Sequence, residues 1–74
     1  MKITLESTTK IVEVNGGIKC RVWEGRTDSG IPISALIPRI AAVDDGNLAE
    51  FEKELREQKA PSVAIEAWPL RLIL

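Results

Sequence analysis

Apolar and polar residues alternate along the first part of the chain, which is the pattern of half-buried β-strands. Ile3 and Leu5 alternate with polar neighbours, and the runs "KIVEV" and "IKCRVWEG" flank "NGG". Asn-Gly between two β-rich runs is the strongest short-range signal for a β-hairpin. Residues 7–9 fit either a bend between two short strands or the middle of one long strand.

A hairpin loop of three residues, 15–17, gives the more favourable register, because it makes one face apolar and supplies a glycine for the left-handed position. A loop of two residues would instead place Glu13 opposite Ile18 and Val12 opposite Lys19. The three-residue loop predicts the pairs Val14 with Ile18, Val12 with Cys20 and Lys10 with Val22 on one face, and Glu13 with Lys19, Ile11 with Arg21 and Thr9 with Trp23 on the other.

A further strand is predicted after this hairpin. "RTDSG" at 26–30 has the composition of a turn, and the strand-like run 31–43 follows it. Pro32 and Pro38 interrupt the run, and proline has no N–H to donate to a neighbouring strand. We therefore expect this strand to lie at a sheet edge or to bend at Pro38.

The last third of the chain predicts a helix and a final strand. The helix "NLAEFEKELREQK" spans 47–59, and Asn47 with Glu50 forms a candidate capping box at its start. After "APS", the run "VAIEAWPLRLIL" is interpreted as a strand that closes the core, with a tail offered to a partner as the alternative. The apolar stripe of the helix is narrow and consists of Leu48, Phe51 and Leu55.

These elements predict an α+β fold in the order β-β-β-β-α-β. We expect a mostly antiparallel sheet with the helix at about 47–59 packed on one face, in a single domain spanning 1–74. One narrow helix cannot cover both faces of the sheet, so an apolar face is left for self-association, and we expect a two-fold homodimer. If the second hairpin turns at 28–30, this second face contains Ile11, Trp23, Ile31, Ile33, Ala35 and Ile37.

Composition and charge favour an intracellular protein and disfavour a phosphate binder. Of 74 residues, 45% are hydrophobic and 28% are charged, as in folded globular domains. Ten Lys and Arg against eleven Asp and Glu give a net charge of −1, without the cationic excess typical of nucleic-acid-binding proteins. The single cysteine rules out an intrachain disulfide, and no apolar run resembles a signal peptide or a membrane span. We expect a cytoplasmic protein without a membrane partner.

The residues needed for most enzymatic chemistry are missing from the sequence. It has no histidine and no tyrosine, and Cys20, without a histidine partner, is interpreted as a buried apolar residue. Asp44 and Asp45 do not have the spacing of a calcium loop, and no phosphate-binding loop is present. We therefore expect no catalytic residue, no metal and no cofactor. A weak alternative is an enzyme that uses Glu24 or Asp28.

A candidate binding surface surrounds Trp23 on one sheet face. Lys19 and Arg21 precede the tryptophan at alternate positions, and Trp and Arg are enriched at the centres of protein interfaces. We expect a small non-enzymatic protein-interaction module that self-associates and contacts another protein. A nucleic-acid-binding accessory protein is the alternative, because cations and an aromatic on a sheet can also hold a single strand. The candidate binding residues are Trp23, Arg21, Lys19, Ile33, Ile37, Arg26 and Arg39.

Four stretches distributed over the chain resemble small proteins encoded in bacterial phage and prophage regions. They are "ESTTKIVEVNG", "RVWEGRTDSGIPISALIPRIA", "FEKELRE" and "APS…PLRLIL". The group has no assigned activity, so the resemblance transfers no catalytic residue. It implies a compact accessory protein in the cytoplasm of a bacterial or phage-infected cell.

Overall fold

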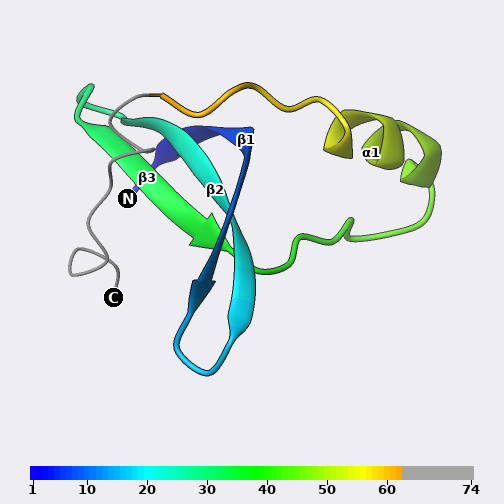
Figure 1. Cartoon of the computed structure of the whole chain (residues 1–74). Coiled ribbons are helices and arrows are strands. Elements are labelled where there is room, and N and C mark those ends of the chain that lie inside the picture. The colour runs from blue at the N-terminus through cyan, green and yellow to red at the C-terminus, as the bar shows by residue number, and fades with distance from the viewer. Residues whose placement is uncertain (63–74) are drawn as a thin grey trace.

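The protein combines a three-stranded antiparallel sheet with one helix in the part of the chain that is described (Figure 1). A computed structural model describes residues 1–62. Strands β1 (Ile3–Val14), β2 (Ile18–Thr27) and β3 (Pro32–Ile37) form a sheet in the order β1-β2-β3, and helix α1 (Leu48–Leu55) follows. The α+β class and the antiparallel sheet agree with the sequence prediction.

The first hairpin has the predicted register next to its turn. Val14 pairs with Ile18 and Val12 pairs with Cys20, across a loop closed by the Gly17 N–H, which donates to the Val14 carbonyl at 3.0 Å. Gly16 and Gly17 have φ angles of 80° and 81°, a region that favours glycine over other residues. The "NGG" sequence therefore determines both the turn and the pairing beside it.

Further from the turn, a bulge in β1 changes the register. Ser7, not Thr9, pairs with Trp23, so the predicted pairs of Thr9 with Trp23 and Lys10 with Val22 are wrong. Residues 8–10 lie opposite Val22, and β1 continues through the bulge as one strand. The structure therefore has three strands before the helix instead of the four expected, because residues 7–9 do not separate two strands.

The second hairpin has the register that places Trp23 on an apolar face. Trp23 pairs with Ala35 and Arg21 pairs with Ile37, around the turn at 28–30. The Thr27 N–H donates to the Ile31 carbonyl at 2.9 Å, and Gly30 has a φ of 90°. β3 forms an edge of the sheet and ends directly before Pro38, as the proline positions indicated.

The most buried residues lie on the sheet face opposite Trp23. Val22 is completely buried and Cys20 is 3% exposed, so the interpretation of Cys20 as a core residue is confirmed. Thr8, in the bulge, is also completely buried, and its hydroxyl donates to the Val22 carbonyl at 2.7 Å. A buried hydroxyl needs such a partner, and this bond ties the bulge to β2.

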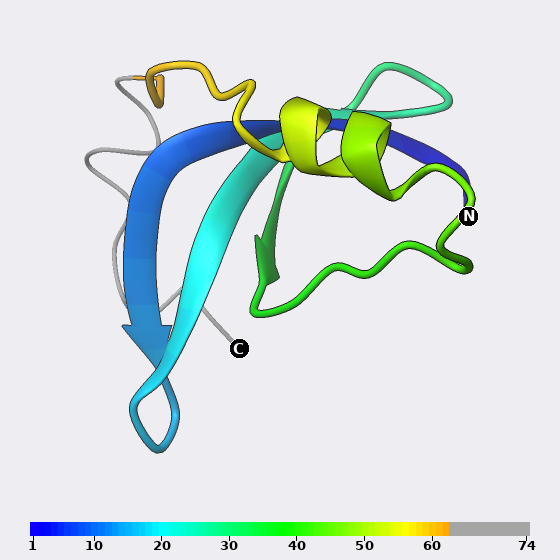
Figure 2. The ribbon, with the colours of Figure 1, turned by 90° about the vertical axis from the view of Figure 1, so that its right-hand side faces the viewer.

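Helix α1 lies over the Trp23 face but does not pack closely against it. Figure 2 shows the helix in front of one end of β1 and β2, while the turn between them projects beyond it. Within the described elements, no Cα atom of α1 lies within 8 Å of a strand Cα atom. The helix therefore lies over one face of the sheet, and side chains from both layers line an open space between them.

The helix is also shorter than the predicted range of 47–59. Among the described residues, no hydrogen bond from the Asn47 side chain caps the helix, so the predicted capping box does not form. After Arg56, the chain leaves the helix and pairs with the bulge of β1: the Lys59 N–H donates to the Ser7 carbonyl at 3.1 Å, and the Thr9 N–H donates to the Lys59 carbonyl at 3.0 Å. Backbone groups that would extend the helix are used in this contact instead.

Residues 57–62, the crossing segment, connect the two sides of the sheet along the edge of β1. The Ser7 hydroxyl donates to the Glu57 carbonyl at 2.9 Å near the helix. On the opposite face, the Ser62 hydroxyl donates to the Glu24 carboxylate at 2.5 Å. The final strand predicted from "VAIEAWPLRLIL" lies outside the described residues.

Candidate protein-binding groove

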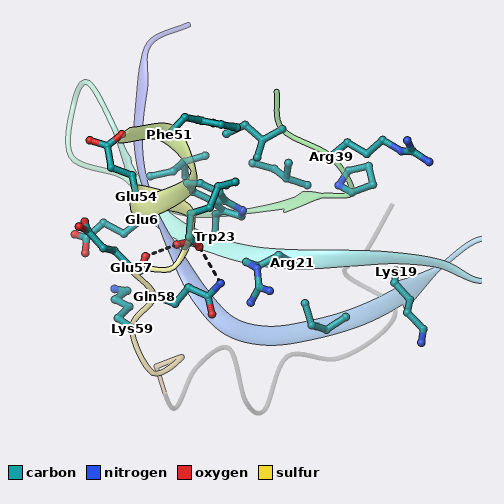
Figure 3. Close-up of a pocket in the computed structure, with 17 residues that line it drawn as sticks. Glu6, Lys19, Arg21, Trp23, Arg39, Phe51, Glu54, Glu57, Gln58 and Lys59 are labelled. Atoms are coloured by element: carbon teal, nitrogen blue, oxygen red, sulfur yellow. Dashed lines mark hydrogen bonds between the residues drawn. The ribbon is translucent and has the colours of Figure 1, made fainter. Parts of the chain in front are cut away.

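A groove of about 730 Å³ separates the Trp23 face of the sheet from helix α1 (Figure 3). Its volume falls in the range of protein binding sites. Its lining is apolar in the middle and charged toward the ends. The apolar lining residues are Leu5, Ile11, Trp23, Ile37, Pro38, Ile40, Phe51 and Leu55.

Trp23 lies in the middle of the groove because of its neighbours in the sheet. Its partners on either side are Ser7 in β1 and Ala35 in β3, both of which have small side chains. Helix α1 contributes Phe51 and Leu55 from across the groove. Small neighbours leave part of the indole accessible, and the side chain is half-buried. The tryptophan therefore presents apolar surface to anything that enters the groove.

The bulge of β1 fixes Arg21 at the bottom of the groove. The Arg21 guanidinium donates through Nη1 to the Thr8 carbonyl at 2.8 Å, and Thr8 is itself held by Val22. A guanidinium carries five N–H donors, so one bond to the backbone orients the group and leaves donor capacity for a ligand. Bulges commonly re-aim a side chain near a functional site.

The two ends of the groove carry opposite charges. Arg39 and Lys19 lie at the end toward the β1–β2 turn, and Arg21 lies between them and Trp23 (Figure 3). Acidic side chains gather at the other end, beside helix α1. These acidic residues are Glu6, Glu54 and Glu57. Lys59 also lines this end, and its Nζ lies 3.5 Å from the Glu24 carboxylate. Charged groups at the two ends can orient a partner, while the apolar middle supplies the contact area.

The structure brings together most of the candidate binding residues but not all of them. Arg26 and Ile33 line a separate hollow, and Arg26 donates through Nη1 to the Gly30 carbonyl at 3.2 Å. These two residues do not belong to the Trp23 groove. The candidates that line it are Lys19, Arg21, Trp23, Ile37 and Arg39.

Glu24, one of the two carboxylates considered for catalysis, binds the crossing segment. Its carboxylate accepts hydrogen bonds from the Ser62 hydroxyl at 2.5 Å and the Ser62 N–H at 3.2 Å, and Lys59 Nζ lies 3.5 Å from it. The Ser62 hydroxyl, with a smaller contribution from Lys59, holds the pKa of Glu24 below its usual value, although burial opposes the shift. All these partners stabilise the charged form of Glu24, so its carboxylate anchors the crossing segment to β2.

The acidic end of the groove is the part that sequence reasoning missed. From the sequence, no binding role was assigned to Glu6, Glu54 or Glu57. Leu55 and Phe51 were recognised as an apolar stripe on the helix. That stripe is the signal that could have indicated that the helix lines the groove. Placing the acids opposite Arg39 requires knowing where the helix lies, which the local pattern does not reveal.

Residues 1–62 contain no cluster of three His, Cys, Asp or Glu side chains that could hold a metal ion. No helix in this range is long and apolar enough to cross a membrane.

Comparison with protein-family models, with curated proteins and with solved structures finds no match for the chain. The groove itself is therefore the basis for any functional proposal.

Proposed function

We propose that this protein is a small non-enzymatic protein-interaction module that holds apolar side chains of a polypeptide in the Trp23 groove. The observation that carries the proposal is a half-buried tryptophan that lines a groove between an apolar sheet face and helix α1. Trp and Arg are the residues most enriched at the energetic centres of protein interfaces. Self-association is part of this proposal, in a bacterial or phage-type accessory role in the cytoplasm.

The rim of the groove supports a polypeptide partner. Ile11, Ile40 and Leu55 line it and are 47%, 48% and 37% exposed. Apolar side chains around a hollow lose contact with water when a partner binds, which contributes roughly 25 cal/mol per Å² of buried apolar area. Contiguous apolar surface of this kind marks interaction sites in soluble proteins.

The charge distribution argues against nucleic acid as the ligand. The groove is lined by carboxylates as well as cations, and carboxylates repel a phosphate backbone. Its charged residues are Lys19, Arg21, Arg39, Lys59, Glu6, Glu54 and Glu57. Trp23 is also the single aromatic side chain that the described sheet strands contribute to the groove, whereas single-strand binders stack several bases on several aromatics. A partner with both apolar and mixed-charge groups fits the lining better.

The test is selection of peptides from a displayed random library, followed by affinity measurement with labelled synthetic peptides. We expect some peptides to bind the wild-type protein with micromolar dissociation constants. Trp23→Ala should weaken their binding at least about tenfold, because hot-spot tryptophans contribute 2 kcal/mol or more. Far-ultraviolet circular dichroism checks that the variant keeps its sheet.

Val43 provides the matched control because it is fully exposed and does not line the groove. Val43→Ala should leave peptide affinity unchanged. The proposal fails if no selected peptide distinguishes the wild type from Trp23→Ala. It also fails if a single-stranded oligonucleotide binds more tightly than any peptide and loses affinity steeply between low and moderate salt.

A further inference from the structure

The charged ends of the groove point to the identity of one partner and to its orientation. We propose that the groove is covered by the groove of a second copy of this chain, related by a two-fold axis that crosses it at right angles to its length. This inference rests on the proposed function and names a partner for the same site. Each copy supplies the same patch in such an interface, so the patch must complement itself.

Self-complementarity follows from the order of charges along the groove. Arg39 and Lys19 lie at one end and Glu54 and Glu57 at the other, with the apolar residues around Trp23 between them (Figure 3). A surface with this order fits a copy of itself that is turned end for end. Opposite charges then meet at both ends, and apolar surfaces meet in the middle.

The charge order also selects one of the two possible two-fold axes. When two identical faces meet, the axis lies in the plane between them, either along the groove or across it. An axis along the groove places each acidic end on the partner's acidic end, and juxtaposed like charges oppose association. An axis across the groove places each acidic end on the partner's basic end.

The exposed apolar rim provides the contact area for the centre of this dimer. Ile11 comes from β1, Ile40 from the connection after β3, and Leu55 from α1, so the rim surrounds Trp23 on several sides. Each of these side chains is more than a third exposed in the single chain. Burial of such a central apolar cluster, surrounded by polar residues, is the usual anatomy of a stable interface.

The first test is the mass of the wild-type protein in solution. Sedimentation velocity and equilibrium should show a monomer–dimer equilibrium with a dissociation constant at or below about 100 µM. A wild type that remains monomeric well above that concentration overturns the inference. Peptide binding to the monomer would still support the proposed function, so the two failures are distinguishable.

Charge reversal tests the orientation. One variant carries Lys19→Glu and Arg39→Glu, and the other carries Glu54→Lys and Glu57→Lys. Each variant by itself should dimerise at least about tenfold more weakly than the wild type, because like charges then meet at both ends. An equimolar mixture should form heterodimers with near wild-type affinity, because each altered end then faces an end of opposite charge.

The mixture separates this geometry from the alternatives. With an axis along the groove, like charges already meet at both ends of the wild-type dimer, and they would still meet at both ends in the homodimer of each variant. Each variant would then dimerise about as weakly as the wild type, and only the mixture would associate more tightly than the wild type. That result overturns the inference. Equal affinity of wild type, variants and mixture overturns it too. Thermal unfolding of each variant confirms that it is folded.

Discussion

At the scale of single residues, Thr8 shows how a polar group organises the sheet. It is completely buried, its hydroxyl donates to the Val22 carbonyl, and its own carbonyl accepts from Arg21. The hydroxyl also accepts from the Lys10 N–H at 3.3 Å. The Thr8 side chain thus connects the bulge to β2, while its backbone carbonyl holds a groove cation. No apolar residue of similar shape can make the two hydrogen bonds of the hydroxyl.

Replacing Thr8 by valine removes the hydroxyl and keeps the shape. We expect Thr8→Val to lower the free energy of unfolding by about 1–2 kcal/mol, because a buried hydrogen bond is lost. Urea denaturation followed by circular dichroism measures the change. Thr9→Val, at an exposed neighbouring position, should change stability by less than about 0.5 kcal/mol. Equal effects of the two substitutions would contradict the role assigned to the Thr8 hydroxyl.

At the scale of elements, the hairpins could be predicted and the bulge could not. "NGG" determined the first turn, and its pairing follows for the residues nearest the turn. The bulge shifts the register between Ser7 and Ile11 by two residues. A shift by two keeps the side chains of residues 3–7, beyond the bulge, on their expected faces. The alternation of apolar and polar residues is unchanged by such a shift and cannot reveal it. The faces were therefore predictable while the pairs beyond the bulge were not.

The predicted end of the helix was wrong for a related reason. The predicted end at residue 59 rested on helix-compatible residues, but the backbone of Lys59 bonds to Ser7 and Thr9 instead. Local propensity is a weak prior that tertiary contacts override. β1 is an edge strand, and its outward backbone groups at Ser7 and Thr9 receive the crossing segment.

The crossing segment should respond to pH through Glu24. Its folded-state pKa lies below the usual value of 4.5, so the charged carboxylate stabilises the fold above that pH and loses this effect as pH falls through the folded-state pKa. At pH 7 we expect Glu24→Gln to be less stable than the wild type by about 1 kcal/mol. The difference should disappear in acid, where the wild-type carboxylate is protonated as well.

Urea denaturation of both proteins between neutral pH and about pH 2.5 measures this difference. Ser62→Ala provides a second variant, because removing the hydroxyl should raise the folded-state pKa of Glu24 toward its usual value and weaken the same pH dependence. Wild-type and Glu24→Gln stability curves that run parallel over the whole range would show that the carboxylate does not anchor the segment.

At the scale of the whole molecule, the sequence located the binding face but not the opposite wall. Alternation along β2 placed Lys19, Arg21 and Trp23 on one side, and all three line the groove. Arg26 was grouped with them by proximity in sequence, yet its alternation already placed it on the opposite face. The acidic wall depends on where the helix lies, and that position follows from the crossing segment and the bulge.

The last prediction concerns the apolar rim, where a charge should separate the dimer without unfolding the monomer. Ile40 is 48% exposed and lines the groove, so Ile40→Asp removes little buried contact within one chain but places a carboxylate where the partner's apolar surface would cover it. Burial of an unpaired charge is strongly unfavourable, so we expect at least about a tenfold weaker dimer and an unchanged unfolding temperature.

Val43→Asp adds the same charge at a fully exposed position outside the groove and should leave the dimer intact. Sedimentation equilibrium and thermal circular dichroism measure both properties. If Val43→Asp separates the dimer as effectively as Ile40→Asp, the effect comes from net charge, and the groove is not the interface.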